Sequence, residues 1–177
     1  MNKLHALLSR REARAATRSR LQREFGLPVI AFTLNIPGPD KDDPGYVPAH
    51  KSGEQALLEL LSRENLNILR TNIVYGPCGR EALFMIRGEA LKLKELCIRL
   101  EESHPLGRLF DFDVYDTRGR TLRRDELHQP RRRCFLCDQP AFECARSRRH
   151  SPDEIRSYLD HLLLSYFGQD KKNDPTG

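Results

Sequence analysis

The stretch HPLGRLFDFDVYD, residues 104–116, decides the fold of this chain. It begins with a turn at His104-Pro105-Leu106-Gly107 and continues into a segment that alternates apolar and polar residues from 109 to 115. Successive side chains of a strand point to opposite faces, so this alternation predicts a strand with one apolar face. Asp111 and Asp113 share its other face. The apolar face is made by Phe110, Phe112 and Val114.

The acid pair on this strand is a candidate metal site. Two carboxylates at i and i+2 stand roughly 6–7 Å apart at a rise of ~3.3 Å per residue, and they repel each other unless a cation lies between them. Mg²⁺ prefers one or two carboxylates together with substrate phosphates. We therefore predict that Asp111 and Asp113 hold Mg²⁺. The alternative is a half-exposed edge strand whose acids are only solvated.

The segments that precede this strand predict an α+β fold. Apolar periodicity and turn residues indicate the order β-α-β-β-α-β, the ferredoxin-like arrangement, whose sheet order is 4-1-3-2 with both helices on one face. The predicted elements are strands over 29–36, 68–75 and 82–87, helices over 47–64 and 89–103, and a hairpin turn over 76–79.

This topology brings three connections to one end of the sheet. The end of the first strand, the hairpin between the second and third, and the start of the fourth all lie there, so the loop 35–41, the turn 76–79 and residues 104–107 should converge. Thr33 and Asn35 would then share the open face with the two aspartates. The substrate-binding candidates from these connections are Asn35, Gly38, Lys41 and Gly76.

We interpret the 177 residues as a single domain with additions at both ends of the core. Residues 1–27 contain a basic helix over 3–25, for which a solvated face is the expected state of most arginines. The core spans 28–116, and an arginine- and cysteine-rich segment follows over 117–150. A helix over 151–170 begins at the capping box of Ser151 and Glu154, before a frayed tail.

The charge is concentrated at the two ends of the chain and predicts a polyanionic partner. Residues 1–25 carry seven basic and two acidic side chains, and residues 117–150 carry ten arginines and four acids. Walker A, GxGxxG and RNA-binding signatures are absent from the sequence, which disfavours nucleic acid. No membrane span or signal peptide is recognisable, and five cysteines do not suit a secreted disulfide framework, so we expect a cytoplasmic protein.

The segment 130–150 carries two further candidate sites. Cys134, Cys137, Cys144 and His150 have the ligand types of a tetrahedral zinc site, although only the first spacing is standard; buried unligated thiols are the alternative. Arginines can bind phosphates bidentately, so we expect this segment to fold back toward His104 and Asp111 and clamp a phosphate-rich substrate. The clamp candidates are Arg131, Arg132, Arg133 and Arg146.

Four segments together resemble a known family. They are LLSRREAR near the N-terminus, FTLNIPGPDKD (32–42), EESHPLGRLFDFDV (101–114) and PRRRCFLCDQPAFECARSRRH (130–150). They are similar to segments of the citrate lyase holo-[acyl-carrier-protein] synthases, the apo-citrate lyase phosphoribosyl-dephospho-CoA transferases. The resemblance covers essentially the whole chain, in the expected order.

The resemblance implies an enzyme that attaches phosphoribosyl-dephospho-CoA, from 2′-(5″-triphosphoribosyl)-3′-dephospho-CoA, to a serine of the acyl-carrier (γ) subunit of citrate lyase. Such nucleotidyltransferase-like chemistry (the EC 2.7.7 class) releases diphosphate and depends on stabilising charge. In this interpretation Arg108 and Lys41 neutralise diphosphate beside the Mg²⁺ of Asp111 and Asp113, and His104 takes the serine proton. The alternative function is a non-catalytic nucleotide- or RNA-binding module.

Overall fold

The computed structural model describes residues 3–38 and 41–170, and it divides the chain into two compact units, residues 1–128 and 129–177. The first unit combines helices with one antiparallel sheet, the α+β class predicted from the sequence. Its helices are α1 (Lys3–Phe25), α2 (Val47–Arg63) and α3 (Ala90–Ser103), and its strands are β1 (Val29–Leu34), β2 (Asn67–Gly76), β3 (Gly79–Arg87), β4 (Phe110–Tyr115) and β5 (Thr121–Leu122).

The sheet has the order β2-β3-β1-β4-β5, so its first four strands are arranged as the sequence predicted. β1 lies between β3 and β4 and is antiparallel to both. The register places Thr33 opposite Asp111 and Ala31 opposite Asp113. The short β5 was not predicted, because two residues are too few to show an alternating pattern.

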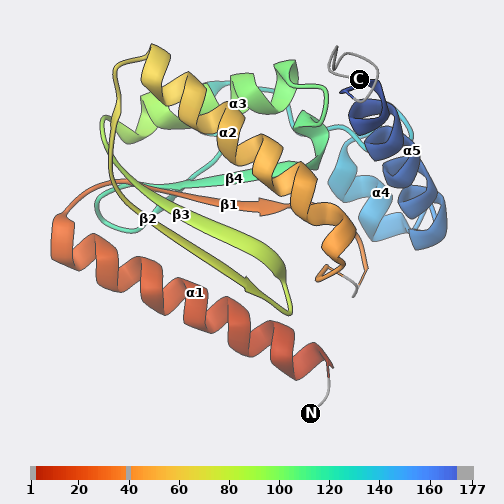
Figure 1. The fold of residues 1–177 in the computed structure, drawn as a ribbon, viewed down its shortest axis with the longest axis horizontal. Coiled ribbons are helices and arrows are strands. Elements are labelled where there is room, and N and C mark those ends of the chain that lie inside the picture. The colour runs from red at the N-terminus through yellow and green to blue at the C-terminus, as the bar shows by residue number, and fades with distance from the viewer. Residues whose placement is uncertain (1–2, 39–40, 171–177) are drawn as a thin grey trace, which may run out of the picture. The chain divides into compact units, whose positions relative to one another are not determined.

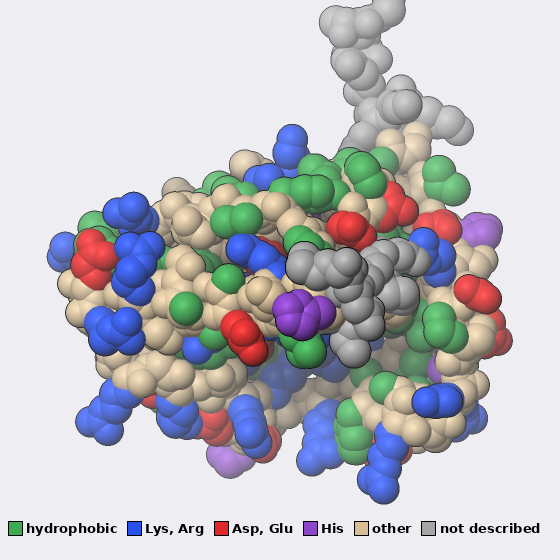
Figure 2. Space-filling model, turned by 90° about the horizontal axis from the view of Figure 1, so that it is seen from below, with side chains coloured by type: hydrophobic (Ala, Val, Ile, Leu, Met, Phe, Trp, Pro, Cys, Tyr) green, Lys and Arg blue, Asp and Glu red, His purple; other side chains and the backbone are tan. Residues whose placement is uncertain are grey.

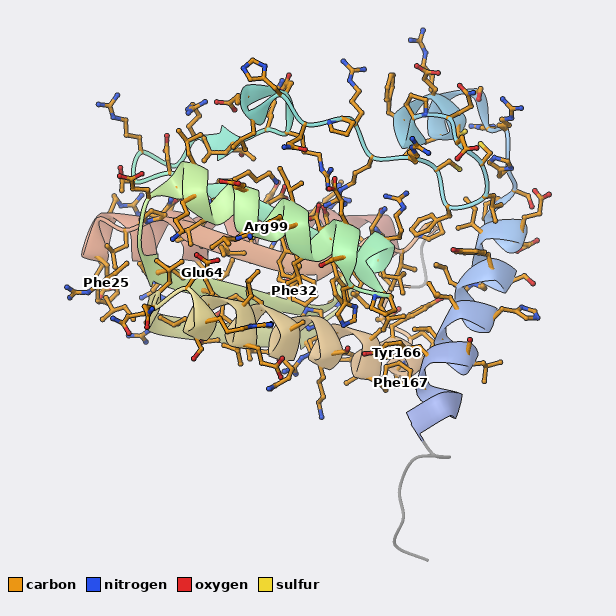
Figure 3. The ribbon with its side chains drawn as sticks, turned by 90° about the horizontal axis from the view of Figure 1, so that it is seen from above. Phe25, Phe32, Glu64, Arg99, Tyr166 and Phe167 are labelled. Atoms are coloured by element: carbon orange, nitrogen blue, oxygen red, sulfur yellow. The ribbon has the colours of Figure 1, made fainter. Side chains whose placement is uncertain are left out.

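One face of the sheet is covered by α2 and α3, as expected (Figure 1). Phe32, Phe110 and Phe112 are fully buried on this face, and the Phe32 and Phe112 rings stack with their centroids 4.3 Å apart. α2 approaches the sheet closely at Gly53, where a Cβ atom would lie 2.4 Å from the Phe32 ring. Figure 3 shows the two helices over Phe32, with Glu64 beside Arg99 of α3 at 3.1 Å.

The opposite face of the sheet is covered by α1 (Figure 1). A solvated face was expected for most arginines of this helix: Arg11, Arg20 and Arg23 are exposed, whereas Arg10, Arg14 and Arg18 are partly buried. Leu21 of α1 is only 2% exposed and packs into a cluster with apolar side chains of β1 and β3. Burial of even a narrow apolar stripe is favourable at about 25 cal/mol per Å², and this stripe meets an apolar patch of the sheet. The cluster comprises Leu21, Val29, Ala31, Leu83 and Met85, with Phe25, Leu27 and Tyr115 packed against it.

Element boundaries differ little from the prediction. β1 ends at Leu34 rather than residue 36, although the Asn35 amide still donates to the Leu109 carbonyl at 2.7 Å, in register with the pairing of β1 and β4. Three 3₁₀ turns were not predicted: η1 (Pro44–Tyr46), η2 (Gly107–Leu109) and η3 (Asp125–Leu127). Turns of three residues carry no periodic signal.

The second unit contains α4 (Ala141–Ser147) and α5 (Pro152–Asp170). The predicted capping box is confirmed: the Ser151 amide donates to the Glu154 carboxylate at 2.7 Å, and the Glu154 amide donates to the Ser151 hydroxyl at 3.1 Å. Before α4, a bridge joins Arg133 to Pro140. A frayed tail was predicted for the last eight residues: Asp170 instead ends α5, and residues 171–177 lie outside the described residues.

Among the helices described for residues 3–38 and 41–170, none combines the length and the apolar character needed to cross a membrane.

Candidate functional site

The candidate active site is a pocket between α1 and the sheet, within the first unit. Its volume is about 480 Å³, within the range of small-molecule sites. Two carboxylates and four cationic side chains line it. They are Asp111 and Asp113 from β4, Arg11, Arg14 and Arg18 from α1, and Lys41 from the loop after β1.

The position of the acid pair follows from the strand pattern. The apolar residues of β4 are fully buried, whereas Asp111 and Asp113 are half-buried on the face toward α1. Thr33 and Asn35 line the same pocket, as the predicted register required. The pairing of β4 with β1 therefore brings both carboxylates to the wall of the pocket that α1 closes from the other side.

The arginines of α1 are held by a buried acid of the sheet. Glu81 of β3 is 2% exposed and accepts from the Arg10 guanidinium at 2.7 Å and from Arg14 at 2.9 Å. Glu81 lies two residues before Leu83, on the same face of β3. A carboxylate at this depth is stable only when it is paired and hydrogen-bonded, so it fixes the register of α1 on the sheet.

Two further cations approach the pocket from different directions. The Arg18 guanidinium stacks over the Tyr115 ring at 3.7 Å from its centroid, which orients it along the pocket wall. Burial, followed by the repulsion of Arg11, lowers the pKa of Lys41, and the nearby Asp111 partly offsets this. Burial and neighbouring cations both disfavour the charged form of Lys41, and an anionic ligand beside it would offset both effects.

The predicted convergence of loops is confirmed for two of the three connections. Lys41 and Cys78 line the pocket together with Asp111. Gly79, at a φ of +79°, lies so close to the Lys41 backbone that a Cβ atom would be 2.3 Å from its carbonyl oxygen. The hairpin turn therefore packs directly against the loop after β1.

Among the described residues, the pocket lining includes neither of the two glycine substrate candidates, Gly38 and Gly76. Gly38 adopts a φ of +80°, in the region that favours glycine. A Cβ atom at Gly76 would lie 3.7 Å from the Arg10 side chain, so this turn packs beside α1.

The third connection, residues 104–107, leads to the other face of the sheet. The His104 ring packs on Phe110 at 4.8 Å between centroids, and Phe110 points toward the helices α2 and α3. The Nδ1 atom of His104 accepts a hydrogen bond from the Leu106 amide at 3.0 Å, and burial lowers the pKa of His104. Among the described residues, the pocket lining includes neither His104 nor Arg108. Their predicted catalytic roles stay predictions.

Sequence reasoning missed the contribution of α1 to this pocket. A signal was present, because Arg10, Arg14 and Arg18 recur every four residues and so share one face of the helix. Basic side chains are spread over the side of the molecule that α1 covers (Figure 2).

The second unit brings the predicted zinc ligands together. One ligand atom from each of Cys134, Cys137, Cys144 and His150 lies within 4.8 Å of all the others. The Cys137 and Cys144 sulfurs are 3.5 Å apart, and His150 Nε2 is 3.3 Å from Cys137 Sγ. The cluster can therefore hold a metal ion.

Electrostatics in the cluster favour a bound cation. Burial, followed by the adjacent Cys137 and Cys134 thiols, raises the pKa of Cys144 to about 12. Burial also opposes the ionisation of Cys134, but hydrogen bonds from the Leu136 and Cys137 amides outweigh it and lower the pKa of Cys134. Thiols this close cannot all ionise unless a positive ion compensates their charge.

The arginines of this unit lie around the cluster. Arg131 stacks on the Phe142 ring at 4.8 Å, Arg133 pairs with Asp138 at 3.2 Å, and the Arg132 carbonyl accepts from the Ala141 amide at 2.8 Å. Arg146, in the last turn of α4, is exposed. The predicted clamp over the strand end would join the second unit to the first, and it stays a prediction.

The fold and the pocket define an α+β protein with a pocket lined by two carboxylates and four cationic side chains. Comparison with known proteins gives the family. The family model of the apo-citrate lyase phosphoribosyl-dephospho-CoA transferases matches residues 2–166, and this chain belongs to that family.

Curated relatives agree with this membership. A protein of Vibrio cholerae serotype O1, named as a probable apo-citrate lyase phosphoribosyl-dephospho-CoA transferase, is 34% identical over 164 residues, which cover 92% of each chain. A protein of Escherichia coli O1:K1 / APEC, named as the transferase, is 36% identical over 157 residues, 89% of this chain and 85% of its own. A relative from Shigella boydii serotype 18 has the same name and the same identity, with 86% of its length covered.

Proposed function

We propose that this protein transfers phosphoribosyl-dephospho-CoA from its triphosphate donor to a serine of the acyl-carrier subunit of apo-citrate lyase, in the cytoplasm. The serine oxygen forms a bond to the α-phosphorus, the bond from that phosphorus to the diphosphate oxygen breaks, and diphosphate leaves. The serine proton passes to water. This is a nucleotidyltransferase-like reaction, in which positioning and charge stabilisation do most of the catalysis.

The observation that carries the proposal is the composition of the pocket. Two carboxylates face four cationic side chains in a space of about 480 Å³. A triphosphate needs cations along its whole length, and Mg²⁺ needs oxygen ligands beside it. A pocket of this size suits the triphosphate and its ribose, so the dephospho-CoA arm would extend beyond it.

In this mechanism Asp111 and Asp113 would hold Mg²⁺, and the ion would supply charge neutralisation beside the transferred phosphoryl group. Arg11, Arg18 and Lys41 bind the β- and γ-phosphates and stabilise the leaving diphosphate. Arg14 is held against Glu81 at 2.9 Å and contributes a fixed positive field. Carboxylates and cations on opposite walls give the donor one orientation, as in-line attack requires.

Two finer assignments belong to the same proposal. The antiparallel sheet with two helices on one face and the order β4-β1-β3-β2 is that of a ferredoxin-like core, to which α1 and β5 are added. Three thiolates and one imidazole suit Zn²⁺ rather than Mg²⁺, so we assign zinc to the cluster of Cys134, Cys137, Cys144 and His150.

The decisive experiment mixes the purified protein with triphosphoribosyl-dephospho-CoA, Mg²⁺ and the apo acyl-carrier subunit, and follows the intact mass of the subunit. We expect the mass to rise by one phosphoribosyl-dephospho-CoA group, with one diphosphate released per transfer. Binding without diphosphate release, weakened steeply by salt, would instead support the non-catalytic nucleotide- or RNA-binding module.

Variants of the acids test the metal assignment. Asp111→Asn and Asp113→Asn should each abolish transfer while leaving the fold intact, because both carboxylates are half-buried at the pocket wall. Asp160→Asn, at an exposed position of α5, is the matched control and should retain transfer. Normal turnover in either pocket variant would remove the acid pair from the mechanism.

The role of His104 is separated from that of the acids by one further variant. Its hydrogen bond to the Leu106 amide and its contact with Phe110 suit a side chain that fixes the turn. We therefore expect His104→Gln to change kcat by a few-fold only. A loss as large as that of Asp111→Asn would restore His104 as the general base.

The arginines can be ranked by the KM for the donor. Arg11→Ala should raise KM at least about tenfold, the equivalent of ~1.4 kcal/mol, whereas Arg20→Ala, exposed on the same helix, should not. The double variant Arg132→Ala and Arg146→Ala tests the predicted clamp of the second unit. An unchanged KM for the donor in this double variant would assign the phosphate contacts to the first unit alone.

A further inference from the structure

The cluster of Cys134, Cys137, Cys144 and His150 brings together distant parts of the second unit. Its ligands come from three places, the loop before α4, the helix α4 and the residue that precedes the capping box of α5. The loop is folded back by hydrogen bonds from the Cys134 amide to the Gln139 carbonyl and from the Ala141 amide to the Arg132 carbonyl, both 2.8 Å. A metal here would therefore link every element of the unit.

All four ligand atoms lie within 4.8 Å of one another, and two of their separations are close to those of a tetrahedral site. With Zn–S bonds of about 2.3 Å, tetrahedral geometry sets the sulfur–sulfur distance near about 3.8 Å, and sulfur–nitrogen distances slightly shorter. The observed Cys137–Cys144 distance is 3.5 Å, and His150 Nε2 lies 3.3 Å from Cys137 Sγ. Four ligands of these types leave no open position, which is the pattern of structural rather than catalytic zinc.

The second unit has almost no hydrophobic core of its own. Among its described residues, 129–170, only Cys144 and Leu159 are buried apolar side chains, and one of these is a candidate ligand. Several large apolar side chains are exposed instead, including Leu164 at 73% and Phe142 at 47%. Segments of about 40 residues rarely bury enough apolar surface to fold unless a metal or disulfide is added.

We propose that the second unit is a zinc-dependent folding module, in which one zinc ion bound by Cys134, Cys137, Cys144 and His150 supplies the free energy that its small core does not. Ligands that must come together only in the folded state make metal binding and folding one equilibrium. The inference does not depend on the transferase function. The pocket residues belong to the first unit, so the proposal concerns a separate part of the chain.

The test uses the full chain, purified under reducing conditions without chelator. We expect one zinc per chain by elemental analysis, and a cobalt-substituted protein with the absorption of tetrahedral cobalt–thiolate coordination. Cys137→Ser should lose the metal. Cys97→Ser, which removes a buried thiol of α3 outside the cluster, is the matched control and should keep it.

Limited trypsin digestion tests the folding role, because the arginines of 131–149 are cleavage sites distributed through the module. Removal of zinc should speed cleavage within this segment at least tenfold while the first unit stays intact, and added zinc should restore protection. Protein that contains no zinc and gives no cobalt spectrum would overturn the proposal. A disulfide in its place, seen as a mass lower by two hydrogens, or equal cleavage with and without zinc, would also overturn it.

Discussion

At the edge of β4 that β5 does not cover, two buried charged side chains of α3, Lys94 and Glu101, satisfy the backbone of the strand. This arrangement gives a stability prediction for which the chain offers a matched control. β5 pairs with β4 only at its last two residues, so the preceding edge has no neighbouring strand. At Phe112 the helix α3 takes that place: Lys94 donates to the Phe112 carbonyl at 3.0 Å, and the Phe112 amide donates to Glu101 at 3.1 Å. Phe112 stands between Asp111 and Asp113, so these contacts fix the strand that carries the acid pair.

The perturbation is Glu101→Gln. The Glu101 side chain is 3% exposed and pairs at 2.6 Å with Arg124, which is 13% exposed. Breaking a buried ion pair costs roughly 3–5 kcal/mol. Glutamine keeps an oxygen for the Phe112 amide, and Arg124 retains a second carboxylate, that of Glu102, at 2.8 Å. We therefore expect a loss of about 2–3 kcal/mol in the free energy of unfolding.

Glu102→Gln is the matched control, because Glu102 pairs with the same guanidinium but its side chain is 51% exposed. A pair so open to solvent contributes below about 1 kcal/mol. In urea unfolding followed by far-UV circular dichroism, an m-value of ~2 kcal/mol/M converts the Glu101 loss into a midpoint lower by about 1–1.5 M. The control should shift by less than about 0.5 M. Equal midpoint shifts for the two variants would refute the argument that the buried pair contributes more to the free energy of unfolding than the exposed pair.

Three further predictions follow from single positions. Burial lowers the pKa of His104, so the unfolded chain takes up the proton first on acidification, and the free energy of unfolding should fall as the pH drops below about 6.5. In urea titrations at pH 7 and pH 5, His104→Gln should reduce this loss of stability. Gly53→Ala places a Cβ atom 2.4 Å from the Phe32 ring and should cost about 1–3 kcal/mol by overpacking, seen as a lower Tm; an unchanged Tm would contradict the close approach of α2. Gly79→Ala would place a Cβ atom 2.3 Å from the Lys41 carbonyl and displace that loop, so the KM for the donor should rise even where the protein remains folded; a normal KM would separate the loop from donor binding.

Local patterns in the sequence determined most of the elements and their order. Alternation in residues 109–115 gave β4, and the capping box at Ser151 gave the start of α5, because both signals lie within a few residues of chain. The order of strands followed from the β-α-β-β-α-β succession, since short connections and handedness allow few arrangements. The ligand types at Cys134, Cys137, Cys144 and His150 likewise indicated a metal site from composition alone.

The tertiary structure alone decided what covers each face of the sheet. The apolar stripe of α1 was too thin to predict its docking, yet Leu21 is buried and Glu81 binds Arg10 and Arg14 across more than sixty residues of chain. Such pairing depends on which elements meet in space, and a one-dimensional pattern does not contain that information. The pocket therefore exists only because α1 brings its arginines to the face on which the period of β4 had already placed Asp111.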